Sequence, residues 1–363
     1  MTRVLINGRF LGQRVTGVQR YARELLKGLD HLLSSNDALR HRFDFEILTP
    51  PGCPRSLRLE SVGTREVGRF QGQVWEQLEL PRYAGNTLLL SLCNTAPMAG
   101  RNIIATILDA SVYAVPEAYS LAFRAWYRIL IPVLGRRSRQ VLTASEFSRA
   151  ELQRFAGVDA EAIVVVPGSG EHILAVSADD GVLDRLSLRS RRYLLAVSSH
   201  SKHKNVAGVA RATNLLDRKD FDVILAGGGN AKVFSQKQAS GDEQIRSTGY
   251  VSDQELRALY EHASCLVYPS FYEGFGLPPL EAMSCGCPVI VSRAASLPEV
   301  CGEAAVYCDP HNPADIARAI GRVMADGTLR DDLRRRGRER ARQFTWSGAA
   351  RSLVDVIGRV VTR

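Results

Sequence analysis

The chain has 363 residues, 45% of them hydrophobic and 23% charged, which is the composition of an ordinary globular protein long enough for two α/β domains. Its formal charge of +9 favours a polyanionic partner, a class that includes nucleic acid, anionic lipid and phosphorylated substrates. No apolar run approaches the ~18 residues of a membrane span, and Met1 leads into a short strand rather than a secretory signal. Seven cysteines without metal-like spacing indicate a reducing compartment, so we expect a cytoplasmic protein, at most peripheral to a membrane.

Short apolar runs alternate with helical patterns along the whole chain, which is typical of βα units around parallel sheets. The expected strands are 3–6, 45–48, 87–92, 103–107, 140–144, 162–166, 193–197, 222–225, 244–247, 265–268, 288–292 and 304–307. The expected helices begin at Gly17 or cover 121–136, 147–155, 205–216, 253–262, 278–284, 313–324 and 346–361. A polar, less periodic stretch at 177–192 predicts a linker, so the sequence predicts an α/β fold with two domains.

The most informative segment is YPSFYEGFGLPPLEA at 268–282, which follows an apolar strand. Glu273 lies in its glycine-rich turn, and Glu281 lies one turn into the helix that follows. Gly276 permits a positive φ and a close approach of the backbone to a ligand, and the prolines after it suit a first helical turn. The free N–H groups of that turn favour an anion such as a phosphate, whereas a glutamate suits sugar hydroxyls.

Other polar motifs follow further strands, at the carboxyl ends where open α/β sheets bind ligands. Gly17 opens a helix, so its N–H can point at a phosphate. Lys204, near the start of another helix, suits a diphosphate leaving group. The pairs Gly227-Gly228 and Tyr250-Val251 each follow a strand and can approach a nucleotide. Simpler explanations remain for these motifs, namely a solvated basic loop at 197–205 and an ordinary capped helix after Val251.

The glutamate pair and the segments around it resemble the signature of the retaining family-four glycosyltransferases, in particular the mannosyltransferase-like members of bacterial O-antigen and exopolysaccharide assembly. The resemblance implies a GT-B architecture: a Rossmann-like acceptor-side domain at 1–178, a nucleotide-sugar domain at 190–345, and a helix at 346–363 that packs on the first domain. It implies catalytic roles for Glu273 beside the donor sugar, Lys204 at the phosphates and Gly17 at the reaction centre.

The same resemblance assigns the remaining binding residues. The donor contacts it implies are Ser199, Lys204, Gly227, Gly228, Tyr250, Val251, Glu273, Gly274, Phe275, Gly276, Leu277 and Glu281, the last of which holds the ribose. On the acceptor or sugar side it implies Asp109 and Arg20.

The chain departs from the family pattern at three places. Leu108 stands where the family usually has a histidine near the donor sugar, so we transfer no catalytic role to it. Ser199 stands near a common arginine, whose charge Lys202 or His203 can supply. The stretch 167–172 replaces a usual Pro-Asn-Gly, a change that we expect to affect a hinge-side turn more than the chemistry.

The resemblance implies transfer of a hexose, with GDP-mannose the first choice of donor, to a lipid-linked or oligosaccharide acceptor at the inner membrane surface. It implies no metal and no organic cofactor. The segment 121–132 mixes aromatic residues with arginines, as an interfacial helix does, although a core-packed helix with a basic outer face explains it too. The arginine run at 334–342 indicates a solvated helix face.

Other functions remain open at this point. They are a transferase using another nucleotide sugar, a nucleotide-sugar epimerase or glycan phosphorylase on the same scaffold, and a non-catalytic nucleotide-sugar-binding protein. The charge alone suggests nucleic acid, but no aromatic and basic motif of a nucleic-acid binder is present in the sequence, so we expect no such partner.

Overall fold

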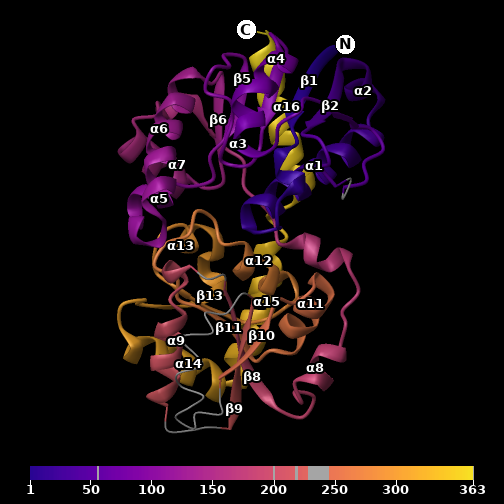
Figure 1. The fold of residues 1–363 in the computed structure, drawn as a ribbon. Coiled ribbons are helices and arrows are strands. Elements are labelled where there is room, and N and C mark those ends of the chain that lie inside the picture. Colours follow the sequence, from indigo (N-terminus) through magenta and orange to yellow (C-terminus); the bar gives the residue numbers. More distant parts are fainter. Residues whose placement is uncertain (55–56, 199–200, 217–219, 228–244, 363) are drawn as a thin grey trace. The chain divides into compact units, whose positions relative to one another are not determined.

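A computed structural model describes residues 1–54, 57–198, 201–216, 220–227 and 245–362. The chain forms two compact units, of which the first consists of 1–168 with 345–363 and the second of 169–344 (Figure 1). Each unit contains one parallel sheet with helices around it, so the predicted α/β fold with two Rossmann-like domains is confirmed.

The sheet of the first unit has the strand order β3-β2-β1-β4-β5-β6-β7, and all of its pairings are parallel. The strands are β1 (Thr2–Asn7), β2 (Phe43–Thr49), β3 (Gly63–Glu66), β4 (Leu88–Ser91), β5 (Ile103–Thr106), β6 (Gln140–Thr143) and β7 (Ile163–Val165). The sequence did not predict β3, because this edge strand is exposed and carries no apolar alternation. The chain order reverses between β1 and β4.

The helices of the first unit include several that the sequence missed. They are η1 (Arg9–Gly12), α1 (Gly17–Ser34), α2 (Asp37–Arg42), α3 (Gly72–Val74), the π-helix η2 (Trp75–Glu79), α4 (Leu80–Ala84), α5 (Ser111–Ala114), η3 (Pro116–Ala118), α6 (Leu121–Arg137), α7 (Glu146–Ala156), η4 (Ala160–Ala162) and α16 (Trp346–Thr362). Trp75, at the start of η2, is completely buried and donates a hydrogen bond from its ring to Val67. The segment from α3 to α4 is thereby anchored by its inner face.

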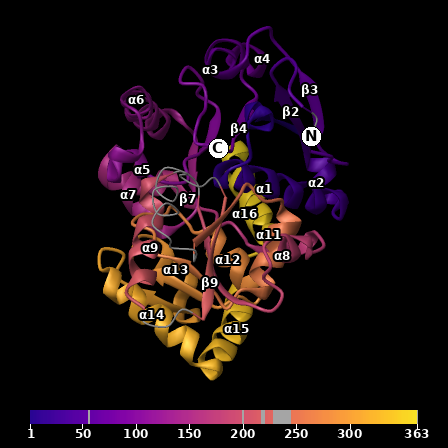
Figure 2. The same cartoon turned by 60° about the horizontal axis from the view of Figure 1, so that its bottom comes forward.

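The last helix, α16, returns to the first unit and lies beside α1 (Figures 1 and 2). The rings of Tyr21 and Trp346 meet edge to face with their centroids 5.8 Å apart. A side chain at Gly28 would place its Cβ 2.6 Å from the Trp346 carbonyl oxygen, so the glycine permits the close contact. This arrangement confirms the expected C-terminal helix on the first domain.

The sheet of the second unit has the order β10-β9-β8-β11-β12-β13, again with parallel pairings. Its strands are β8 (Arg192–Val197), β9 (Phe221–Ala226), β10 (Ile245–Gly249), β11 (Cys265–Tyr268), β12 (Val289–Ser292) and β13 (Ala305–Cys308). Its helices are η5 (Glu171–Ala175), α8 (Gly181–Arg185), η6 (Lys202–Lys204), α9 (Val206–Asn214), α11 (Asp253–His262), α12 (Leu277–Ser284), α13 (Leu297–Cys301), η7 (Gly302–Ala304), α14 (Pro313–Ala325) and α15 (Gly327–Ala341). Here the chain order reverses between β8 and β11.

The stretch 177–192, expected as a linker, belongs to the second unit. It contains α8, which packs against α11, and Arg185 pairs with Glu255 at 2.6 Å. Its buried residues, Val182 and Leu183, are too few to produce a clear helical period. The chain instead passes between the units at 168–169 and 344–345.

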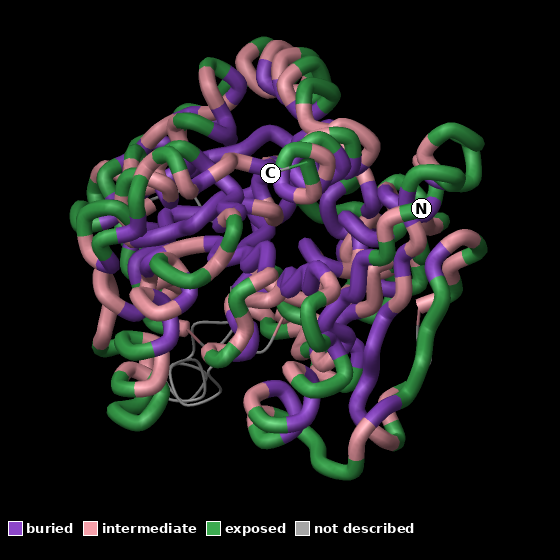
Figure 3. The backbone as a smooth tube through the Cα atoms, turned by 90° about the horizontal axis from the view of Figure 1, so that it is seen from above, coloured by how far each residue is buried: buried purple, intermediate pink, exposed green. Residues whose placement is uncertain are grey.

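Buried residues follow the strands of both sheets, and exposed residues lie on outer helical turns and loops (Figure 3). The large side chains in the core include Tyr193, Tyr260 and Tyr268 in the second unit. Two of these three tyrosines place their hydroxyl groups beside the polar site described below.

Candidate active site

A lysine–glutamate pair lies where the chain order reverses in the second unit. Lys204 is on η6 after β8, and Glu273 is on the turn after β11, the strand that pairs with β8. The Lys204 Nζ donates hydrogen bonds to both carboxylate oxygens of Glu273, at 2.7 and 2.8 Å, and to the Tyr268 hydroxyl at 2.7 Å. Ligands of open α/β sheets bind at such reversal points.

The Lys204 ammonium is charged in this environment. Burial disfavours its charged form, but the Glu273 carboxylate and the Tyr268 hydroxyl outweigh that effect and raise the pKa of Lys204 well above its usual value. Burial, and then the Glu273 carboxylate, raises the pKa of Tyr268, so that hydroxyl keeps its proton. The three N–H donors of Lys204 face three acceptors. A phosphate can therefore bind Lys204 only by displacing one of them.

The turn that carries Glu273 is fixed by its own backbone. The Ser296 hydroxyl bonds the carbonyl oxygens of Glu273 and Phe275, at 2.9 and 2.8 Å. Gly276, the residue before α12, has a φ of +111°, which is a conformation that side chains rarely adopt. The first residues of α12 are Leu277, Pro278 and Pro279, so the helix starts where the sequence analysis expected. Pro278 and Pro279 carry no N–H, and the Leu280 N–H bonds the Gly276 carbonyl at 3.4 Å, so the first turn of α12 can offer an anion the N–H of Leu277.

The second glutamate of the motif, Glu281, is held by two buried side chains. Its Oε1 lies 3.0 Å from the His172 Nε2, and its Oε2 accepts a hydrogen bond from the Tyr260 hydroxyl at 3.0 Å. The other ring nitrogen of His172 lies 3.2 Å from the Ser169 carbonyl oxygen. The two ring nitrogens of His172 thus each face an acceptor oxygen. Burial and the Glu281 carboxylate raise the pKa of Tyr260 well above its usual value.

A backbone contact brings His172 close to Glu281. A side chain at Gly170 would collide with the backbone of Leu280 and Glu281, so only glycine lets η5 approach α12 this closely. Ser169 also donates a hydrogen bond from its hydroxyl to the Phe344 carbonyl, at 2.7 Å. Ser169 and Phe344 are the first and last residues of the second unit, so His172 connects Glu281 to both chain crossings.

The first unit has its own cavity, of about 560 Å³, also where the chain order reverses. Its polar lining comes from loops after β1, β4 and β5 and from the start of α1, and its aromatic lining comes mainly from α6. The lining residues used below are Arg9, Gln19, Gln73, Asp109, Phe123 and Trp126. The rings of Tyr119, Phe123 and Tyr127 stack in series, with centroid distances of 5.0 and 4.3 Å. An aromatic wall beside hydrogen-bonding groups suits a ligand with both apolar and hydroxyl faces, such as a sugar ring.

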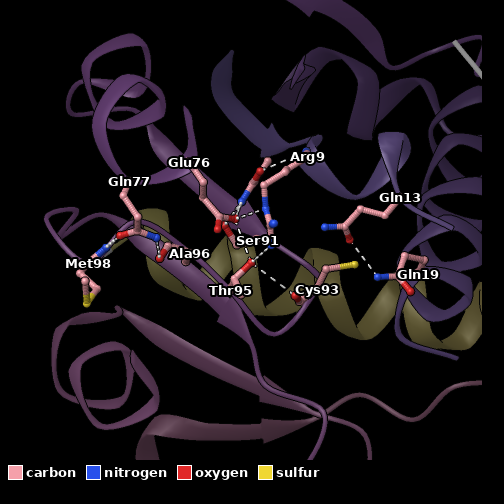
Figure 4. Close-up of polar contacts among 11 residues, drawn as sticks. Arg9, Gln13, Gln19, Glu76, Gln77, Ser91, Cys93, Thr95, Ala96 and Met98 are labelled. Atoms are coloured by element: carbon pink, nitrogen blue, oxygen red, sulfur yellow. Dashed lines mark hydrogen bonds and ion pairs between the residues drawn. The ribbon is translucent and has the colours of Figure 1, made fainter. Parts of the chain in front are cut away.

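A buried ion pair supports the wall of this cavity (Figure 4). The Glu76 Oε1, from the π-helix η2, lies 3.2 Å from the Arg9 Nε and accepts hydrogen bonds from Thr95 and Asn7 at 2.9 and 2.6 Å. Arg9 also donates to Thr95 at 2.7 Å. The Glu76 side chain is fully buried, and π-helical turns often occur at functional sites. The guanidinium of Arg9 is thus fixed where it lines the cavity.

Comparison with known proteins decides the family. Residues 185–340 match the family described as Glycosyl transferases group 1. The chain is 34% identical over 262 residues to O-antigen chain mannosyltransferase B of Escherichia coli, covering 69% of each protein. It is 25% identical over 339 residues to O-antigen chain mannosyltransferase RfbU of Salmonella typhimurium, covering 88% of this chain and 90% of that one.

The chain belongs to the group 1 glycosyltransferases. A solved structure, sucrose-phosphate synthase from Thermosynechococcus elongatus, superposes with a TM-score of 0.79 over the full length of both chains at 18% identity. At that identity the likeness shows the fold alone, and it confirms GT-B. The matched family residues, 185–340, fall in the second unit, which holds Lys204, Glu273 and Glu281. Assignment to family four stays a prediction.

The remaining expected donor contacts of this glycosyltransferase lie at the ends of β9 and β10. Gly227 has a φ of +110° and donates a backbone hydrogen bond to Gly249 at 2.8 Å. Tyr250 is 64% exposed and follows β10, whereas Val251 is buried. Two more expected contacts, Ser199 and Gly228, lie outside the described residues, and the site is described without them.

Of the site residues expected in the first unit, Asp109 lines the cavity, whereas Gly17 and Arg20 do not. Gly17 is the first residue of α1, and the space around a Cβ at that position is open. Asp109 lines the cavity and accepts a hydrogen bond from the Ser111 backbone at 2.8 Å. Arg20 does not line it, and its guanidinium lies 3.7 Å from Glu24 on the same helix. Leu108 is buried. Its aliphatic side chain cannot make the polar contact that a histidine could make at this position.

The sequence analysis missed Arg9, Glu76 and His172. The available signal for Glu76 was its place between Trp75 and Leu80, two core residues of a helical segment that the sequence analysis did not predict. Nothing in the local pattern around Arg9 distinguishes it from a surface arginine. The stretch 167–172 was expected to affect a hinge-side turn more than the chemistry, and in the structure it brings His172 to Glu281.

Proposed function

We propose that this glycosyltransferase transfers mannose from GDP-mannose, with retention of the anomeric configuration, to a lipid-linked or oligosaccharide acceptor during bacterial surface polysaccharide synthesis. The observation that carries the proposal is the Lys204–Glu273 pair at the β8–β11 reversal, beside the start of α12. The names of two relatives, both O-antigen chain mannosyltransferases, support the choice of sugar.

The reaction breaks the bond between the sugar C1 and the diphosphate oxygen and forms a bond from C1 to an acceptor oxygen. The acceptor hydroxyl gives its proton to the departing diphosphate, so GDP leaves and no separate general base is needed. Lys204 and the backbone N–H of Leu277 at the start of α12 stabilise the charge that develops on the leaving group. We assign the neutralisation of the leaving diphosphate to protein cations and amides, and propose neither a metal nor an organic cofactor for it.

Donor binding exchanges the partners of the Lys204–Glu273 pair. All three N–H groups of Lys204 face acceptors, two of them on Glu273. When a diphosphate oxygen takes one of these positions, the Glu273 carboxylate gains a free acceptor for a sugar hydroxyl. Glu281, which bonds His172 and Tyr260, serves the ribose hydroxyls as a hydrogen-bond acceptor. The pair thus serves both ends of the bond that breaks.

The acceptor side is assigned to the first unit. Its cavity combines the aromatic side chains of α6 with Arg9, Gln19 and Asp109, which suits a saccharide terminus. Among the described residues no helix is both long and apolar enough to cross a bilayer. We therefore propose that a lipid-linked acceptor is reached from the surface of the membrane, with the protein on the cytoplasmic face.

The deciding experiment incubates the purified chain with GDP-, UDP-, ADP- and dTDP-sugars, with and without a lipid-linked oligosaccharide and its delipidated saccharide. We expect GDP release from GDP-mannose only when an acceptor is present, and an α-linked product by NMR. The same yield with EDTA is expected. Turnover with another donor alone would replace mannose, and donor binding without turnover on any acceptor would overturn the proposed reaction.

A further inference from the structure

Two exposed apolar stripes lie on the helical segments that wall the cavity of the first unit. The first, the 70–78 stripe, consists of Phe70, Val74 and Leu78, which are 54%, 50% and 56% exposed. The second, the α6 stripe, consists of Leu121, Ala125 and Ile129, of which the leucine and isoleucine are 78% and 58% exposed. Leu121, Ala125 and Ile129 are four residues apart on α6 and so follow one side of it, while Val74 and Leu78 are four apart on α3 and η2, and Phe70 precedes α3.

Both stripes lie on segments that contribute other residues to the lining of the same cavity. Gln73, the neighbour of Val74, lines it from α3, and Phe123 and Trp126 line it from α6. A ligand in this cavity is therefore bordered by apolar surface on both helical segments. Large apolar groups that sit together on a surface mark an interaction site more often than single ones do.

The inner face of each segment is firmly packed, so the exposure of the stripes does not come from a loose helix. Arg69 and Phe70, which precede α3, donate hydrogen bonds from their backbone N–H groups to the Glu79 Oε2, at 2.9 Å each. On α6, Leu130 and Ile131 are buried in the core of the unit. The 70–78 stripe and the α6 stripe are the outward faces of these anchored segments.

The charges that α6 itself carries are all positive. Residues 118–145 contain five arginines and no aspartate or glutamate. Within the described part of the chain, no ion pair involves Arg128, Arg136 or Arg137 of α6, or Arg82 near the end of the 70–78 stripe.

The arginine run of α15 differs, because acids of the same helix pair with Arg334, Arg335 and Arg336. Arg334 pairs with Asp331 at 2.8 Å, and Arg335 pairs with Asp332 and Glu339 at 2.8 and 3.1 Å. An exposed arginine cluster in this protein therefore does not by itself indicate a partner. Arginines beside apolar stripes favour an anionic surface with an apolar interior.

We propose that the 70–78 stripe and the α6 stripe dock this protein on an anionic phospholipid bilayer, with the cavity of the first unit opening between them. The stripes enter the boundary between headgroups and acyl chains, and the arginines contact lipid phosphates. This inference rests on the proposed function, because it names the surface from which a lipid-linked acceptor enters that cavity. It adds a second helical segment to the one that the sequence suggested.

The test measures binding of the full chain to vesicles of phosphatidylcholine with 30% phosphatidylglycerol, and to vesicles of phosphatidylcholine alone. We expect binding to the anionic vesicles that weakens with salt. The double variant Val74→Asp/Leu78→Asp and the double variant Leu121→Asp/Ile129→Asp should each lower the partition coefficient at least tenfold. Arg136→Gln/Arg137→Gln should lower it roughly fivefold for each arginine removed.

A matched control places the same charges on exposed apolar residues of the second unit. Leu174 and Leu215 are 44% and 57% exposed, and Leu174→Asp/Leu215→Asp should leave vesicle binding within twofold of the wild type. Circular dichroism and thermal melting of every variant establish that it folds.

The outcomes separate docking from the proposed reaction. With a delipidated saccharide acceptor, the stripe variants should turn over like the wild type, and with the acceptor in vesicles they should be slower. Absence of wild-type binding to anionic vesicles, or unchanged binding by both stripe variants, would overturn the docking proposal. It would also be overturned if light scattering showed a wild-type dimer that the stripe variants dissociate, because the stripes would then join two copies. Failure of the reaction itself would appear as absent turnover on the delipidated acceptor.

Discussion

The two units place a cation and a glutamate at the same topological position but in different surroundings. Arg9 and Glu76 lie at the β1–β4 reversal of the first unit, and Lys204 and Glu273 lie at the β8–β11 reversal of the second. The Glu76 side chain is fully buried and that of Arg9 is 12% exposed, whereas the side chains of Glu273 and Lys204 are 9% and 17% exposed. The topology brings charges together in both units, and the local burial decides whether a ligand can reach them.

The comparison separates a supporting pair from a reacting pair. A pair whose glutamate is inaccessible fixes the wall of a cavity, and its removal costs stability. A pair that a ligand can enter contributes to transition-state stabilisation, and its removal costs turnover. Each prediction below tests which of these costs belongs to which unit.

The largest effect is expected from Glu76→Ala, which leaves Arg9, whose side chain is only 12% exposed, without its carboxylate. Breaking a buried pair by removing one partner costs about 3–5 kcal/mol, so the free energy of unfolding should fall by that amount in a urea titration. Glu46→Ala is the control, since Glu46 pairs with Arg3 and Arg65 at the surface and should cost below about 1 kcal/mol. Equal losses for the two variants would contradict a supporting role for the buried pair.

Lys204→Ala should lower kcat by about 10²–10³-fold, which is the typical effect of losing one charge-stabilising donor in an active site. The Michaelis constant for the donor should change less, because the charge on the leaving group develops in the transition state. Lys27→Ala removes an exposed lysine of the first unit, which pairs with Glu24, and should retain most of the activity. If the two lysine variants lose the same activity, or neither loses any, the site in the second unit is wrong. Glu273→Ala should resemble Lys204→Ala.

A smaller effect is expected from His172→Ala, which removes one of the two holders of Glu281. We expect the KM for the donor to rise roughly tenfold, because a buried carboxylate loses a hydrogen bond, while kcat stays within threefold. His172→Gln, which can still donate to Glu281, should recover part of the loss. His262→Ala is the matched control, since His262 lies 3.5 Å from Asp180 at the surface of the same unit. A fall in kcat alone would assign His172 a different role.

The sequence predicted the donor side well where the signal is local. Gly276 and the prolines after it determine the turn and the start of α12, and the apolar run 265–268 determines the strand before it. Which strands neighbour each other is not local, and the bond between Lys204 and Glu273 depends on β8 pairing with β11. The sequence analysis therefore assigned a role to each of these two residues but did not predict that they are hydrogen-bonded to each other.

The first unit was less predictable, because its polar core is assembled from distant segments. Asn7 and Glu76 are 69 positions apart, and the hydrogen bond between them exists only after β1 and η2 come together. The segment 72–84 has few periodic apolar residues, so neither its helices nor the burial of Glu76 could be predicted. The exposed strand β3 was missed for the same reason, since strand signals depend on burial of one face.

The smallest effect is expected from a change of pH, which should leave the stability contributed by the Lys204 charge unchanged between pH 7 and pH 9. The pKa of Lys204 is raised above its value in the unfolded chain, so the stability that its charge contributes is fully present below the unfolded pKa and is lost only as the pH rises through the folded one. The difference in melting temperature between the wild type and Lys204→Met should therefore be the same at pH 7 and pH 9. Met replaces the aliphatic part of the side chain, so the difference reports mainly the charge. A difference that shrinks towards pH 9 would show that Glu273 and Tyr268 do not hold the proton on Lys204, and the reacting pair would then lack its cation under working conditions.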